Sequence, residues 1–226
     1  MHFQSMLNTA MQSRIQAEAC AKWLQDNGLP LHADPPKNWD NALAVQAAAE
    51  HVKDGWILDA GAAPGSAFLQ GMAKLRPDLM GKLWGCNTDM HGLVNGHQGI
   101  NYARVDIQNM PLAWTELFDF IACLSVIEHG VDVLSFLDCA QRCLRPGGHL
   151  FISTDYWIDP VHTGGQMAFG APVKVYDQLQ IDGIVRVAES CGLRLTGRLD
   201  LRCGQRTVQW LGMEYTFINL LLRKED

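Results

Sequence analysis

The chain has 226 residues and a formal net charge of −6, with 48% apolar and 19% charged residues. These values suit one globular domain and exclude a disordered chain. The acidic balance offers no basic surface to a phosphate backbone, so we expect no extended nucleic acid as a partner. No stretch approaches the roughly 18 apolar residues of a membrane span, and the N-terminal residues lack the basic flank and apolar run of a secretory signal. We therefore expect a cytoplasmic protein without membrane contact, either a monomer or a homodimer.

The cysteines do not form a recognisable metal or disulfide pattern. Their number is odd, and there is no C-x-x-C pair and no spacing to histidines typical of zinc. Packing explains Cys139 and Cys143, which share a helix face, more readily than metal binding does. We expect reduced thiols, mainly in the core, at positions 20, 86, 123, 139, 143, 191 and 203.

Residues 1–53 are predicted to form a helical cap beside the main domain. Apolar residues recur at helical spacing from Met6 to Gln25. A second helix is predicted from Trp39 to His51, with Asn38 or Asp40 as its cap.

Residues 56–65, W-I-L-D-A-G-A-A-P-G, combine a short apolar strand with a glycine turn. An apolar helical pattern follows at 67–75. Gly61 and Gly65 allow unusual backbone dihedrals and a close approach to a ligand. In α/β proteins a strand, turn and helix in this order form the place where a nucleotide-like ligand binds.

Strands and helices alternate after the glycine turn, which predicts an α/β fold. We expect a Rossmann-like, seven-stranded, mostly parallel sheet with helices on both faces, occupying residues 54–226. The last two strands follow each other without a helix, as an antiparallel terminal hairpin requires. An irregular loop at about 156–175 is long enough to be functional. Further strands are predicted at 82–87, 100–107, 118–126, 149–154, 193–201 and 215–223, further helices at 134–144 and 177–190, and at most a short or broken helix at 90–99.

Polar residues follow the strand ends. In an open parallel sheet these ends line one crevice, so residues far apart in sequence converge there. The residues concerned are Asp59, Asn87, Asp106, Ser125, Glu128, His129 and Asp155.

Four motifs resemble, in order and spacing, those of class I S-adenosylmethionine-dependent methyltransferases, and in particular the small-molecule type-11/type-23 group. The resemblance covers about residues 55–151 and implies a Rossmann-like fold, S-adenosylmethionine as cofactor and methyl transfer as the reaction. The motifs are D-A-G-A-A-P-G at 59–65, D-I at 106–107, F-D-F-I-A-C-L-S-V-I-E-H at 118–129 and C-L-R-P-G-G at 143–148.

The resemblance also implies the residues that hold the cofactor. The glycine turn would pass under the methionine end, where Asp59 orients the turn or receives the ammonium group. Either Asn87 or Asp89 would hold the ribose. The implied cofactor-binding residues are Asp59, Ala60, Gly61, Ala62, Gly65, Asn87, Asp89, Asp106, Ile107, Leu124 and Ser125.

Within that set, the resemblance implies that Asp106 accepts from the adenine amino group, that Ile107 packs against the ring, and that Leu124 and Ser125 line the floor near the sulfonium. A plainer interpretation stays open for Asp89 and Asp106, because Asp is favoured in turns for its bonds to nearby backbone.

His129 is the candidate catalytic residue, as a general base toward a substrate hydroxyl or amine, because an imidazole titrates near neutral pH. Alternatively, His129 caps the fourth strand or forms a hydrogen bond to the methionine part of the cofactor.

Two related chemistries are disfavoured. Some methyltransferases bind a divalent ion through Glu-x-x-Glu-His, but here Ser125 replaces the first Glu before Glu128 and His129, and Asp155 or His162 would have to complete the set, so we expect no metal. The loop G-A-A-P-G also occurs in ribosomal RNA 2′-O-methyltransferases of the heat-shock type. Their Lys-Asp-Lys-Glu set has its Asp just after the fourth strand, where this chain has Ser125 to His129.

The predicted function is methyl transfer to oxygen or nitrogen of a small molecule, with a sugar or secondary metabolite as the suggested acceptor. The residues expected to bind it are Lys37, Trp39, Tyr156, Trp157 and His162, with Met167 and Phe169 in the same loop. An NAD(P)-dependent oxidoreductase is one alternative, although Ala63 replaces the second glycine of G-x-G-x-x-G and no Tyr-x-x-x-Lys pair is seen. A non-catalytic S-adenosylmethionine-binding protein is the other.

Overall fold

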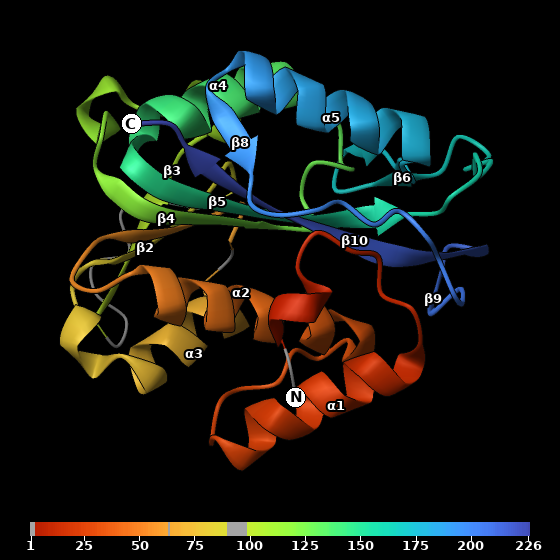
Figure 1. Ribbon diagram of the computed structural model, residues 1–226, viewed down its shortest axis with the longest axis horizontal. Coiled ribbons are helices and arrows are strands. Elements are labelled where there is room, and N and C mark those ends of the chain that lie inside the picture. Colours follow the sequence, from red (N-terminus) through yellow and green to blue (C-terminus); the bar gives the residue numbers. More distant parts are fainter. Residues whose placement is uncertain (1–2, 63, 90–98) are drawn as a thin grey trace.

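The computed structural model describes residues 3–62, 64–89 and 99–226. The segment in which at most a short helix was expected, 90–99, falls almost entirely outside them. The described chain forms one sheet between two layers of helices (Figure 1). The strand order is β3-β2-β1-β4-β5-β10-β8, and β9 pairs with β10 outside this path.

The parallel half of the sheet is apolar and buried on both faces, as parallel sheets generally are. Leu58 in β1 lies opposite Trp84 of β2 on one side and Ile121 of β4 on the other. These strands are β1 (Ile57–Ala60), β2 (Leu83–Asn87), β3 (Ile100–Arg104), β4 (Phe118–Leu124) and β5 (Leu144–Tyr156).

The other end of the sheet is antiparallel, as predicted. Strand β10 (Met213–Lys224) lies between β5 and β8 (Leu193–Leu195) and runs antiparallel to both. The sheet has one strand more than the seven expected, because β9 (Val208–Trp210) pairs with the start of β10. Inside the predicted irregular loop, β6 (Met167–Ala168) and β7 (Ala171–Pro172) form a separate small hairpin.

Helices cover both faces of the sheet, as expected. On one face lie α4 (Val133–Cys143) and α5 (Gln178–Ser190); on the other lie α1 (Arg14–Asp26), α2 (Asn38–His51) and α3 (Ala67–Leu75) (Figure 1). Side chains at the N-caps define several helix starts: Ser66 Oγ accepts from Leu69 N at 3.2 Å, and Asp177 forms a capping box with Gln180. Short 3₁₀ turns are η1 (Phe3–Met6), η2 (Pro35–Lys37), η3 (Pro77–Leu79), η4 (Ile107–Asn109) and η5 (Leu112–Trp114).

The N-terminal segment differs from its prediction. The helix expected from Met6 begins only at Arg14, because residues 9–11 are extended and pair with other strands. Ala10 forms a bridge with Ile218, and Met11 N donates to the Phe217 carbonyl at 2.8 Å. The boundary at residue 53 stays a prediction.

The predicted cap of the second helix is wrong. Asn38 Oδ1 accepts from His32 N at 2.9 Å, and the Asp40 carboxylate accepts from Ser153 Oγ at 2.6 Å, so neither caps the helix start. Helix α2 is buried along most of its length, and it packs against α3, β4 and β5. This packing carries the first turn of α2 to the middle of the sheet.

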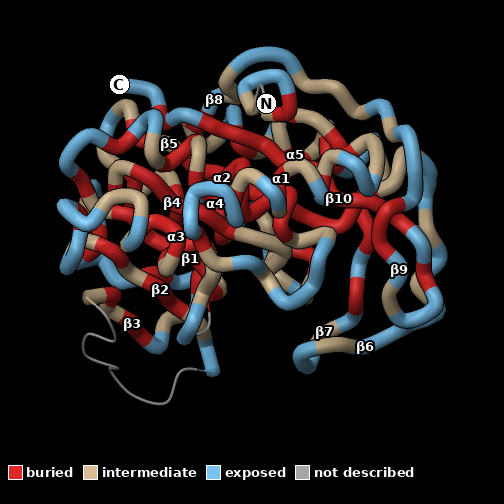
Figure 2. Tube along the Cα trace, turned by 90° about the horizontal axis from the view of Figure 1, so that it is seen from below, coloured by how far each residue is buried: buried red, intermediate tan, exposed pale blue. Residues whose placement is uncertain are grey.

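Buried residues follow the strands and α2, whereas β6 and β7 lie largely exposed at one end of the molecule (Figure 2). All seven cysteines are free, and five are buried, in agreement with the reduced thiols expected. Across the described residues no helix combines the length and apolarity needed to cross a membrane.

Candidate active site

A cavity of about 810 Å³ lies at the ends of the parallel strands. It begins beside the glycine turn and extends to β9 and the first residues of β10. The strands run in one direction, so their C-terminal ends collect groups distant in sequence. Nine of the predicted site residues line it: Lys37, Gly61, Asn87, Asp89, Asp106, Ile107, Leu124, Ser125 and His129.

The glycine turn is held between the ends of β1 and β2. Gly61 N donates to the Cys86 carbonyl at 2.8 Å, and its own carbonyl accepts from Asn87 Nδ2 at 2.9 Å. The φ of Gly61 is +96°, and a Cβ there would lie 2.4 Å from Cγ2 of Val126. Only glycine fits this position, which keeps backbone exposed to the cavity.

Asp59 lies behind the turn. Its Oδ2 accepts from Ser66 Oγ at 2.6 Å, and Ser66 caps α3, so Asp59 connects the end of β1 to the start of the helix. Burial raises the pKa of Asp59 to about 7, against the opposing effect of the Ser66 hydrogen bond. Asp59, Ala60, Ala62 and Gly65 are placed around the turn but not on the cavity wall.

Asn87 and Asp89 have different surroundings. Both polar atoms of the Asn87 side chain are engaged within the protein, because Nδ2 donates to Gly61 and Oδ1 accepts from Asp89 N at 3.2 Å. The Asp89 side chain is exposed at the cavity mouth.

Asp106 makes a turn interaction and also lies on the cavity wall. Its Oδ1 accepts from Gln108 N at 2.9 Å and caps η4, which is an ordinary turn interaction. It also lines the cavity, beside the buried Ile107.

The end of β4 has unusual backbone geometry. Ser125 has a φ of +52°, uncommon for a residue with a side chain, and its N donates to the Ser153 carbonyl at 3.0 Å. Its Oγ is buried and has no hydrogen-bond partner among the described residues. Strained residues of this kind tend to occur at functional sites.

His129 lies half-buried on the cavity wall. Its ring makes edge contacts with Phe169, at 4.9 Å between centroids, and with Trp210, at 6.0 Å. Burial, and secondarily the charge of Lys37, lowers the pKa of His129, so the imidazole is neutral at neutral pH. Within the part of the chain that the structure describes, Nδ1 has no hydrogen-bond partner.

Three buried acidic side chains, those of Asp40, Glu128 and Asp155, form an acid cluster, and Glu128 and Asp155 line the cavity. Lys37 Nζ lies 3.2 Å from Asp40 Oδ2, and Thr154 Oγ1 donates to Glu128 Oε2 at 2.9 Å. The strand-end pattern had predicted that Glu128 and Asp155 converge on one crevice, whereas Asp40 was expected only as a helix cap. The sequence did not indicate that α2 would bring Asp40 to Glu128, in the turn after β4, and to Asp155 of β5.

The titration of the acid cluster is strongly shifted. Burial raises the pKa of Glu128 to about 7, and burial together with the neighbouring Glu128 raises the pKa of Asp155 well above its usual range. Burial lowers the pKa of Lys37, but the three carboxylates outweigh this effect and hold it above its ordinary value. Lys37 therefore keeps its positive charge.

The other four residues expected to bind the acceptor lie away from the cavity. Trp39 is fully buried in the core, and Tyr156 donates from its hydroxyl to the Leu201 carbonyl at 2.6 Å. Trp157 stacks under Arg206 at 4.5 Å, and His162 is exposed. The aromatic wall instead consists of Phe169, Trp210, Tyr215 and Phe217. Sequence patterns had indicated only Phe169 of these.

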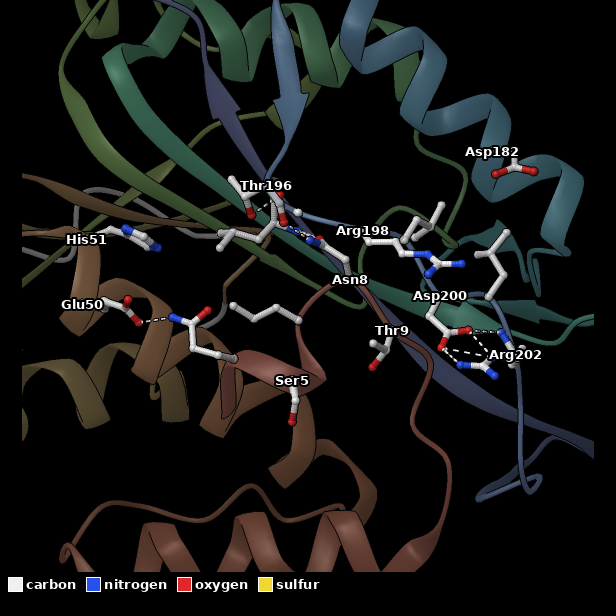
Figure 3. A pocket seen from close by; sticks show the side chains of 16 residues that line it. Ser5, Asn8, Thr9, Glu50, His51, Asp182, Thr196, Arg198, Asp200 and Arg202 are labelled. Carbon is white, nitrogen blue, oxygen red and sulfur yellow. Dashed lines mark hydrogen bonds and ion pairs between the residues drawn. The ribbon is translucent and has the colours of Figure 1, made fainter. Parts of the chain in front are cut away.

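The described residues contain no group of three or more His, Cys, Asp or Glu side chains arranged to hold a metal ion. A second cavity, of about 1010 Å³, lies between the N-terminal segment, the end of α2 and residues 196–202 (Figure 3). Its polar side chains largely pair with one another, as Gln4 does with Glu50 and Asp200 with Arg202. It contains none of the predicted site residues, so the cavity beside the glycine turn is the candidate active site.

The fold and this cavity define a class of α/β protein that binds a nucleotide-like cofactor at the C-terminal edge of its sheet. Residues 31–172 match the family model described as a methyltransferase domain. The chain belongs to this methyltransferase family and has the class I fold of the S-adenosylmethionine-dependent members, as the sequence motifs predicted.

Relatives and solved structures with this fold act on different acceptors. A ubiquinone biosynthesis O-methyltransferase of Acinetobacter baumannii is 28% identical over 159 residues, which cover 66% of this chain and 65% of the relative. The match therefore spans slightly less than two thirds of the relative's length. The 1,6-didemethyltoxoflavin-N1-methyltransferase of Burkholderia thailandensis, solved with S-adenosylhomocysteine, has a TM-score of 0.57 at 14% identity, covering 94% of this chain and 88% of that one.

A 16S rRNA (adenine(1408)-N(1))-methyltransferase from Catenulisporales acidiphilia has a TM-score of 0.51 at 13% identity, covering 80% of this chain and 92% of that one. The fold is thus shared by proteins with small-molecule and RNA acceptors, and the acceptor must be argued from the site.

Proposed function

We propose that the protein transfers a methyl group from S-adenosylmethionine to oxygen or nitrogen of a small molecule. The observation that carries this proposal is the continuity of one cavity from the glycine turn, past Ser125, to His129 and the aromatic wall. Cofactor and acceptor can therefore meet at the end of β4. An acceptor from sugar or secondary metabolism, as suggested by the sequence, stays part of the proposal.

The residues around the turn fit the cofactor. Gly61 lines the cavity without a side chain, so a ligand there would contact its backbone. Ile107 would pack against the adenine, Asp106 would accept from its amino group, and Leu124 and Ser125 would lie below the sulfur. Asp59 does not line the cavity; its hydrogen bond with Ser66 would hold the turn in place.

We assign the ribose to Asp89. The amide of Asn87 is already committed to Gly61 and to Asp89 N, whereas the carboxylate of Asp89 faces the cavity. A carboxylate accepts two hydroxyl donors at once, which suits a ribose.

His129 would take the proton of the acceptor. When bound, S-adenosylmethionine supplies a methyl group on a sulfonium, which is a good leaving group. Alignment of the acceptor with this methyl group would lower much of the barrier, and a neutral imidazole suffices as base. The lowered pKa of His129 keeps the imidazole in the form that accepts a proton.

The N-terminal residues contribute to the acceptor side. Lys37 lines the cavity from the start of α2, and Nζ lies 4.9 Å from the Phe217 ring centroid. The region proposed as a cap, 1–53, therefore supplies part of the wall.

Calorimetric titration tests the proposal in two steps. S-adenosylmethionine and S-adenosylhomocysteine should bind, and NADH should not; binding of NADH alone would favour the oxidoreductase. Asp89→Ala should weaken S-adenosylhomocysteine about tenfold or more, the loss of hydrogen bonds to a charged group. Asp138→Ala, on the exposed side of α4, is the control. Turnover of the cofactor with a panel of hydroxyl and amine acceptors then separates an enzyme from a non-catalytic binder.

A further inference from the structure

The acid cluster places three buried carboxyl groups beside the acceptor side of the cavity, with one lysine among them. Lys37 is the one Lys or Arg among the described residues of the cavity wall, and its Nζ donates a hydrogen bond to Asp40. Glu128 and Asp155 share the wall with it. Burial disfavours the ionised forms of Glu128 and Asp155 and no second cation of the described cavity wall offsets this effect, so a cationic ligand beside them would stabilise the carboxylates.

Glu128 has one carboxylate oxygen without a hydrogen-bond partner in the described structure. Its side chain is 1% exposed and lines the cavity, yet only Oε2 is hydrogen-bonded, to Thr154. Its Oε1 is buried and has no partner in the described structure. A buried carboxylate oxygen without a donor is costly, and a ligand that brings a charged N–H removes the cost.

Asp155 and the aromatic wall complete the surroundings of such a ligand. Tyr215 hydrogen-bonds the Asp155 carboxylate and also faces the cavity. Phe217, Trp210 and Phe169 add ring faces and edges, which accommodate ammonium groups as well as apolar groups.

We infer that the acceptor is an amine, bound in its ammonium form by Glu128 and Asp155 and methylated on nitrogen. This inference rests on the proposed function and narrows it from oxygen or nitrogen to nitrogen. An N–H proton of the bound ammonium passes to the His129 imidazole, which leaves a lone pair on nitrogen for the transfer. The imidazolium so formed releases its proton to solvent afterwards.

The experiment uses three probes of similar size: 2-phenylethylamine, a cation; 2-phenylethanol, neutral; and 3-phenylpropanoic acid, an anion. Their binding to the full-length protein saturated with S-adenosylhomocysteine is measured by calorimetry and ligand-observed NMR, so no turnover occurs. S-adenosylhomocysteine is titrated first; if it does not bind, the proposed function itself fails, independently of the amine.

We expect the amine to bind at least tenfold more tightly than the alcohol, and the acid more weakly than both. Glu128→Gln should remove the preference of amine over alcohol while leaving alcohol binding within about twofold, because Gln keeps the bond from Thr154. Asp155→Asn is the second variant, and Glu189→Gln, an exposed acid on α5, is the control. Thermal unfolding and S-adenosylhomocysteine affinity show that each variant is folded.

Equal binding of alcohol and amine overturns the inference. So does tighter binding of the acid, a failure of the amine to bind at millimolar concentration, or an amine preference that survives both substitutions.

Discussion

Asn87 donates from Nδ2 to the Gly61 carbonyl at 2.9 Å and thereby connects the end of β2 to the glycine turn of β1. The bond spans the part of the cavity in which the cofactor is proposed to bind. It makes Asn87 a support of the turn, whereas its position at the strand end had suggested direct contact with the ribose.

Asn87→Ala should therefore weaken S-adenosylhomocysteine binding about three- to tenfold, since the Gly61 carbonyl loses a partner worth about 1 kcal/mol and the turn loosens. Asn101→Ala is a matched control, because Asn101 Nδ2 donates to the Gly81 carbonyl, also at 2.9 Å. Calorimetry measures both affinities. Equal effects of the two substitutions would show that the Gly61 bond has no special part in binding.

Gly61→Ala should abolish detectable S-adenosylhomocysteine binding, because the new Cβ would lie 2.4 Å from Cγ2 of Val126 at a φ of +96°. Gly65→Ala is the control for backbone strain: its φ is +94°, but the nearest atom to the Cβ is 3.8 Å away. Adding Val126→Ala to Gly61→Ala should recover part of the affinity. If Gly65→Ala weakens S-adenosylhomocysteine binding equally, backbone strain rather than the clash with Val126 explains the loss of affinity.

Asp59→Asn should remove a pH dependence of stability. In the folded protein burial raises the pKa of Asp59 from 3.8 to about 7, so the folded state binds a proton more tightly than the unfolded state. The unfolding free energy is therefore unaffected below pH 4 and falls as the pH rises to about 7, by up to about 4 kcal/mol.

Asparagine cannot ionise, and it still accepts from Ser66. Urea unfolding at pH 4 and pH 7 should show the variant close to the wild type at the lower pH and more stable by a few kcal/mol at the higher one. A difference that does not change with pH would contradict the shifted pKa.

His129→Asn should remove the acid limb of the pH–rate profile. The pKa of His129 lies below the ordinary 6.5, and only the neutral imidazole accepts a proton. The rate constant kcat should therefore fall as the pH drops through this lowered pKa. In the variant kcat should be about 100-fold lower and lack this limb. His162→Asn, an exposed histidine of the acceptor loop, is the control. An unchanged acid limb in His129→Asn would exclude His129 as the base.

Most of the framework follows from local sequence. The strand at Trp56 to Leu58, the glycine turn and the helix after it depend on apolar runs, on Gly61 and on the Ser66 cap, all of which act within a few residues. Asp106 and Leu124 to Ser125 come at strand ends, and a parallel sheet necessarily places such ends at one edge. The meeting of these residues on one cavity wall was therefore predictable, and their contact with the cofactor stays a proposal.

The part of the cavity proposed for the acceptor could not be predicted from the sequence, because it is built from contacts between distant segments. Trp39 was expected in the pocket, but the packing of α2 on the sheet directs it into the core and brings Lys37 and Asp40 to the cavity side. Trp210 reaches the cavity because β9 pairs with β10, and no periodic pattern marked that short strand. The strand ends predicted that Glu128 and Asp155 converge, but sequence spacing carries no information about the arrival of Asp40 from α2.

Periodicity, turn chemistry and strand order are local properties, and for this chain they are sufficient to define the sheet, its glycine turn and the methyltransferase motifs. The charge and shape offered to the acceptor belong to the tertiary structure alone. They depend on how α2 packs on the sheet and on where β9 and β10 place their aromatic side chains, and burial there raises the pKa of the Glu128 and Asp155 carboxyl groups.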